Sequence, residues 1–88
     1  MVVFRVRKDT EVNKLASAIA TNLKNTNSIE LSCLGVGAIN QAVKGIITAR
    51  AMVSQSGDDF GIVPYFDKTI LEDQEKTLII FRLNKNII

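Results

Sequence analysis

The stretch Leu34-Gly35-Val36-Gly37-Ala38-Ile39-Asn40-Gln41-Ala42-Val43-Lys44 decides the fold. An apolar, strand-like segment leads into it, two glycines turn the chain, and a helical pattern follows. Glycine suits such a turn because it accepts backbone angles that other residues resist. The first amides of the outgoing helix have no helical partner and can attract an anion such as phosphate. The segment lacks the third glycine of a dinucleotide fingerprint and the Lys-Ser/Thr pair of a phosphate loop, so spacing alone favours a plain strand-to-helix turn.

Strands and an amphipathic helix precede this turn. Residues 2–7 alternate as a strand that puts Arg5 and Arg7 on one face. We expect a helix over residues 10–25, capped by Asp9 or Thr10, and a second strand over residues 29–34. The apolar positions of this helix follow the i, i+3, i+4, i+7 template: Val12, Leu15, Ala16, Ile19, Ala20 and Leu23.

A second helix is expected over residues 38–53. Arg50 falls on its apolar side, where it either reaches out to solvent near the helix end or braces a strand end or a partner subunit. The apolar stripe comprises Val36, Ile39, Ala42, Val43, Ile46, Ala49 and Val53, and the polar side comprises Asn40, Gln41, Lys44 and Thr48.

Two long extended segments, residues 60–71 and 75–83, follow a loop and are joined by an acidic hairpin turn over residues 72–75. The turn is suboptimal because no glycine follows Asp73, and Pro64 favours an edge strand or a bulge. The order β-α-β-α-β-β predicts one α+β domain over residues 1–88, a two-layer sandwich with a four-stranded mixed sheet. Two helices cover one face of such a sheet, so the other face, apolar in the last strand, either meets a second subunit, which we expect, or is covered by a helix that wraps further round the sheet.

Composition excludes several classes of function. The 88 residues include no histidine, so Ser-His-Asp triads, Cys-His pairs and His-ligated metals are excluded, and we predict no catalytic residue, metal or cofactor. The single Cys33 cannot form an intramolecular disulfide and reads as a buried, inert thiol. The longest apolar run is far shorter than the ~20 residues of a membrane span, and residues 2–7 read as a strand rather than a signal peptide. We therefore expect a cytoplasmic protein without a membrane partner.

The modest net charge of +2 is unevenly distributed. Residues 1–50 carry seven Lys/Arg against three Asp/Glu, a balance of +4, whereas residues 51–88 carry four against six, a balance of −2. A basic N-terminal half is compatible with a phosphate-bearing partner.

The motifs Gly35 to Lys44, Ala49-Arg50, Val53-x-x-Ser56-Gly57, Ile62-x-Pro64-x-Phe66 and Glu75-Lys76-Thr77 together resemble the signature of stage V sporulation protein S. The similarity covers nearly the whole chain at matching spacings. That family is bacterial, is implicated in the regulation of sporulation and development, and resembles the Alba chromatin proteins in fold.

The resemblance implies a homodimer that binds DNA or RNA, with basic residues after the first strand and hairpin arms that reach along the duplex. The first site falls on Arg7 and Lys8, with Asn13 and Lys14 behind them, and the glycine turn falls on Gly35-Val36-Gly37. Val36 replaces the basic residue of the Alba turn, Asp9 stands where a second lysine is usual, and the hairpin tip is acidic.

We therefore expect weak, salt-sensitive and largely non-specific nucleic-acid binding by a homodimer, with a tetramer left open. The alternatives are a protein-interaction module without nucleic-acid binding and, as a third reading, an anion binder or enzyme that uses the turn from Gly35 to Asn40. The nucleic-acid site would comprise Arg5, Arg7, Lys8, Asn13, Lys14, Gly35, Gly37, Asn40, Gln41 and Lys44.

Overall fold

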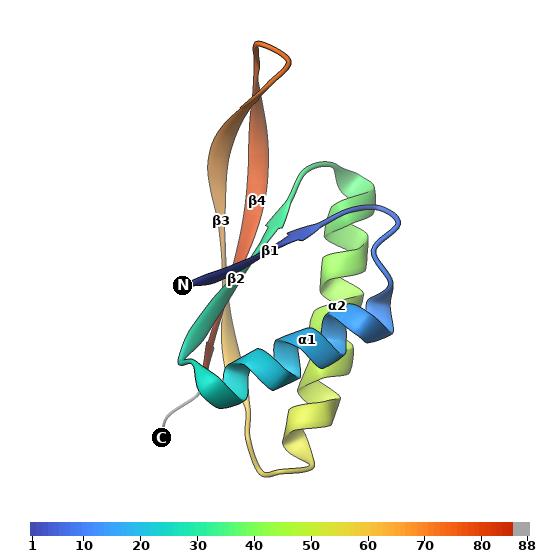
Figure 1. Cartoon of the computed structure of the whole chain (residues 1–88), viewed down its shortest axis with the longest axis vertical. Coiled ribbons are helices and arrows are strands. Elements are labelled where there is room, and N and C mark those ends of the chain that lie inside the picture. Colours follow the sequence, from blue (N-terminus) through green and yellow to red (C-terminus); the bar gives the residue numbers. More distant parts are fainter. Residues whose placement is uncertain (86–88) are drawn as a thin grey trace.

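A computed structural model of the chain describes residues 1–85. It contains the predicted order of six elements: β1 (Val2–Val6), α1 (Val12–Asn25), β2 (Ser28–Cys33), α2 (Val36–Ser54), β3 (Phe60–Leu71) and β4 (Gln74–Lys85). Both helices lie on the same side of the sheet, and the β3–β4 hairpin projects beyond them as an arm (Figure 1). The predicted domain runs to residue 88, and its last three residues lie outside the described part of the chain.

The four strands form one sheet in the order β1-β2-β4-β3. β1 pairs with β2 in parallel, whereas β4 is antiparallel to both β2 and β3, so the prediction of a mixed sheet is confirmed. β3 lies at one edge of the sheet, where Pro64 is tolerated because its missing N–H is not needed to pair with another strand. The C-terminal strand is therefore an interior strand of the sheet.

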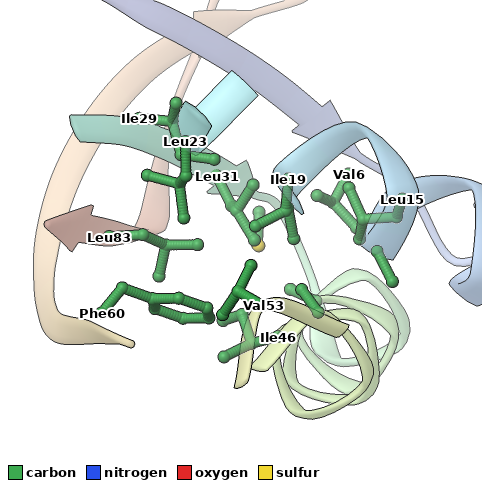
Figure 2. Close-up of a cluster of buried hydrophobic side chains, with 14 of the residues drawn as sticks. Val6, Leu15, Ile19, Leu23, Ile29, Leu31, Ile46, Val53, Phe60 and Leu83 are labelled. Atoms are coloured by element: carbon green, nitrogen blue, oxygen red, sulfur yellow. The ribbon is translucent and has the colours of Figure 1, made fainter. Parts of the chain in front are cut away.

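The core lies between the helices and one sheet face (Figure 2). Ile29, Leu31 and Leu83 from the two central strands are fully buried and meet the apolar stripe of α1. Cys33 is buried among them, and burial raises the pKa of its thiol to about 11, so the prediction of a buried, inert cysteine is confirmed.

The helices approach each other closely at Gly45. A Cβ atom at this position would lie 2.6 Å from Cδ2 of Leu15 on α1. Only glycine leaves room for that contact, and this position therefore fixes how α2 crosses α1 (Figure 1).

The start of α1 differs from the prediction. The helix begins at Val12, and its N-cap residue Glu11 makes no side-chain hydrogen bond to the first turn. The predicted caps, Asp9 and Thr10, are wrong because the Thr10 hydroxyl faces back along the chain, where Oγ1 accepts a hydrogen bond from the backbone N–H of Arg7 at 2.8 Å.

The apolar stripe of α2 is narrower than predicted. The helix begins two residues early, at Val36, whose side chain is 84% exposed, and Val43 is also exposed. Arg50 is exposed as well, and it pairs with both carboxylate oxygens of Asp59 at 3.0 and 3.1 Å. That pair raises the pKa of Arg50 and lowers that of Asp59, which also accepts from the Phe60 N–H at 2.8 Å. Arg50 therefore braces the start of β3 from the surface.

The hairpin turn is shorter than predicted. Glu72 and Asp73 alone connect the strands, with positive φ angles of 52° and 60°, and β4 begins at Gln74. Two consecutive positive φ angles are the geometry of a tight two-residue hairpin, which Asn-Gly normally supplies. The arm therefore ends in two acidic residues in a backbone conformation that favours glycine.

Candidate nucleic-acid interface

The connection between β1 and α1, residues Arg7 to Thr10, forms a compact loop that we call the basic turn. The backbone N–H of Thr10 donates to the Arg7 carbonyl at 3.1 Å, and the Thr10 hydroxyl accepts from the Arg7 N–H. Because these two bonds close the loop on itself, the exposed side chains of Arg7 and Lys8 are presented from a defined backbone.

The first turns of α2 support the basic turn from behind. A Cβ at Gly37 would lie 2.7 Å from Cβ of Lys8, so the glycine lets the two backbones touch. Gln41, one turn further along α2, donates from Nε2 to the Thr10 carbonyl at 2.8 Å. The glycine motif therefore holds the basic loop in place, a role that the sequence did not reveal.

A groove of about 770 Å³ opens beside the basic turn, and we call it the basic groove. It collects five of the predicted site residues: Arg5, Arg7, Lys8, Gly35 and Gly37. The start of α2 contributes its unpaired amides, which favour an anion. The remaining lining comes from β1, β2 and the turn after it, the first turn of α2 and the arm: Val3, Val6, Ser32, Leu34, Ala38, Thr69, Ile70, Leu71 and Leu78.

The other predicted site residues lie outside the groove lining. Asn13 and Lys14 are exposed at the start of α1, where Lys14 lies 3.6 Å from Glu11, and Asn40 and Lys44 are exposed on α2. Gln41 is half-buried, and its donor is used by Thr10. The Gln41 amide is therefore engaged with Thr10 rather than available to a phosphate, whereas Lys44 is exposed and can extend the basic surface.

Sequence reasoning missed the arm side of the groove, namely Thr69, Leu71 and Leu78. These residues come near β1 only because β4 pairs with β2, a long-range arrangement with no local signal. The arm tip beyond them is acidic, with exposed Glu72, Asp73 and Glu75, and Lys68 neutralises Glu75 at 2.9 Å.

The open sheet face carries both polar and apolar side chains, and Ile80 and Arg82 of β4 share it as predicted. Glu30 and Arg82 lie opposite each other on β2 and β4, and the phenol of Tyr65 donates a hydrogen bond to Glu30. This bond raises the pKa of Tyr65. Ile80 of β4 is buried on this face, whereas Val3 of β1 and Val63 and Leu71 of β3 remain 53%, 51% and 48% exposed on it.

Residues 1–85 contain neither a metal-binding cluster nor a membrane-spanning helix. No cluster of three or more Cys, Asp or Glu side chains in this range is arranged to hold a metal ion. No helix in the same range has the length and apolar character needed to cross a membrane.

A mixed four-stranded sheet with two helices on one face and a projecting hairpin defines an Alba-like α+β protein. Alba from Thermoplasma volcanium superposes with a TM-score of 0.64 at 15% sequence identity, covering 97% of this chain and 99% of that chain. At that identity the likeness establishes the fold. The sequence matches the family Stage V sporulation protein S (SpoVS) over residues 2–86, and the chain belongs to that family. The resemblance seen in the sequence is thereby confirmed, and the protein is a small sporulation-related protein.

Proposed function

We propose that this protein is a dimeric, non-enzymatic nucleic-acid-binding regulator that acts in the bacterial cytoplasm, at the nucleoid where DNA is the ligand. The observation that carries the proposal is the basic groove, in which Arg5, Arg7 and Lys8 converge beside the amides of α2. Cations and helix N-termini are the groups that contact phosphate backbones, and such contacts position a protein without reading sequence. Binding is therefore salt-sensitive and largely non-specific.

The surface on which a second copy packs combines the exposed apolar flank of α2 with the helix side of the edge strand β3. Val43 and Ile47 lie on this flank with Arg50, whose partner Asp59 directly precedes β3. Ile62 and Phe66 of β3 point to the helix side of the sheet but are 44% and 76% exposed. Clusters of exposed apolar side chains of this kind are typical of protein interfaces.

A two-fold dimer through this flank leaves the basic turn of each copy free. The residues that would form the dimer contact lie outside the groove lining, so dimer formation and nucleic-acid binding do not compete for the same surface: Val43, Ile47, Ile62 and Phe66. Replacement of Ile47 by Glu on the exposed helix surface should yield monomers in sedimentation equilibrium. If that variant and wild type sediment alike as monomers, the dimer is refuted.

The direct test is a titration of labelled duplex DNA and single-stranded RNA at 50 and 200 mM salt. With four to five phosphates neutralised, affinity should fall by on the order of 10²–10³ between the two concentrations. Lys8→Gln should weaken binding and reduce the salt slope by about 1. The matched control is Lys24→Gln, which removes another exposed charge from the last turn of α1, outside the groove.

One observation favours a second candidate, a protein-interaction module. The arm ends in Glu72 and Asp73, which repel phosphate and suit a basic protein surface. No binding of either nucleic acid at 50 mM salt would refute the first proposal and select this one. Binding that is insensitive to salt would equally contradict the phosphate-neutralising mode.

A further inference from the structure

The basic groove has apolar as well as cationic walls. Leu34, which follows β2, is 41% exposed in it, and Leu78 of β4 and Leu71 of the arm line the same space. A duplex keeps the flat faces of its bases stacked inside, so it offers these leucines much less apolar surface than an unstacked base does. An unpaired nucleotide presents both an anionic phosphate and the flat apolar face of a base.

Resting on the proposed function, we propose that the basic groove binds one unpaired nucleotide of a single-stranded nucleic acid, with its phosphate on Arg7 and Lys8 and its base against Leu34 and Leu78. The volume of about 770 Å³ lies within the range of roughly 300–1,000 Å³ typical of small-ligand sites. The site is therefore large enough for a base with its sugar and phosphate.

The distribution of groups in the groove matches a nucleotide. The α2 amides and the basic turn form its anion-binding part, since Gly35, Gly37 and Lys8 all contribute to the lining. The hydroxyls of Ser32 and Thr69 lie among the apolar side chains and can pair with the edge of a base. Hydroxyls donate and accept, so they tolerate every base, and the groove selects unpaired over paired nucleotides without reading sequence.

The test compares three ligands of equal length and label by fluorescence anisotropy at 100 mM salt: a single strand with bases, an abasic single strand and a blunt duplex. We expect the strand with bases to bind about tenfold more tightly than the abasic strand, because the base buries apolar surface against the leucines. Leu34→Ala should reduce that ratio to less than threefold. Val63→Ala, which trims an exposed apolar side chain of β3 outside the groove, should leave it unchanged.

A second measurement needs no variant. A nucleoside 5′-monophosphate should shift the backbone amide resonances of Gly35, Gly37 and Leu78 in an NMR titration, and ribose 5-phosphate should shift those of the two glycines alone. Equal binding of the strands with and without bases overturns the inference. If the duplex then still binds with a steep salt dependence, the proposed function survives. If none of the three ligands binds, both proposals fail.

Discussion

Gln41 offers the sharpest test of how the helix start holds the basic turn. Its Nε2 donates across 31 residues of sequence to the Thr10 carbonyl at 2.8 Å, in a half-buried position. Gln41→Ala removes that donor, so the Thr10 carbonyl loses this hydrogen bond. A hydrogen bond of this kind contributes about 0.5–1.5 kcal/mol net. We therefore expect a loss of about 1 kcal/mol in the free energy of unfolding, which for a domain of this size lowers the Tm by roughly 4–8 °C.

The assay pairs urea unfolding with the nucleic-acid titration. Asn40→Ala is the matched control, because Asn40 is the exposed neighbour on the same helix turn and its one side-chain contact is a 3.5 Å approach to Gln41 itself. Asn40→Ala should change stability by less than 0.5 kcal/mol. Gln41→Ala should also weaken nucleic-acid binding, because the loop that presents Lys8 loses an anchor.

Two results would refute this reasoning. Equal unfolding midpoints for Gln41→Ala and Asn40→Ala would show that the bond to Thr10 contributes nothing. A destabilised Gln41→Ala with unchanged affinity, measured well below its Tm, would show that the anchor does not position the basic turn for binding.

Three other predictions concern the fold and its protonation. Gly45→Ala should lose about 1–2 kcal/mol of stability in urea unfolding, because overpacking at the helix crossing outweighs the helix propensity of alanine. The control is Gly61→Ala, whose new Cβ meets no atom within 4 Å and should leave stability nearly unchanged. Equal losses for the two variants would contradict the close helix crossing. Tyr65 is the single tyrosine in a chain without tryptophan, so phenolate absorbance reports it alone. The midpoint of the Tyr65 titration should lie above pH 10 and should fall in Glu30→Gln, because the hydrogen bond to Glu30 raises the pKa of the phenol. The stability that this bond contributes is complete below pH 10 and is lost as the pH rises through the folded-state pKa. A titration midpoint that Glu30→Gln leaves unmoved would exclude the bond. Asp73→Gly should raise the Tm, because glycine adopts the φ of 60° without the steric cost borne by aspartate; a lower Tm would contradict the turn geometry.

Local sequence patterns were sufficient to predict the order of the elements, because each helix or strand shows its own spacing of apolar residues. The α1 stripe predicted the buried residues Leu15, Ile19 and Leu23, since a helix against a sheet buries one face. Pro64 placed β3 at an edge because a missing N–H is tolerated there. These inferences needed no knowledge of distant contacts.

The errors arose where a distant contact decided the outcome. Val36 and Val43 match the helical period of the core, yet the sheet and α1 contact α2 on another side and leave both exposed. Thr10 is a good N-cap residue, but its hydroxyl accepts a hydrogen bond from the Arg7 N–H instead of one from the first turn of α1. Gln41 looked like a free donor for phosphate until its partner, Thr10, was placed beside it. The basic groove combined predicted cations with arm residues that only the sheet pairing brings near.

The interior position of β4 has a consequence for biosynthesis. β4 is the last of the six elements to leave the ribosome, yet it lies between β2 and β3 in the finished sheet. Until it emerges, β3 has no strand to pair with, and Ile29 and Leu31 lack their cross-strand neighbours Leu83 and Phe81. The nascent chain therefore carries an open, apolar strand edge until β4 has emerged, and a truncation within β4 removes the middle of the sheet rather than its margin.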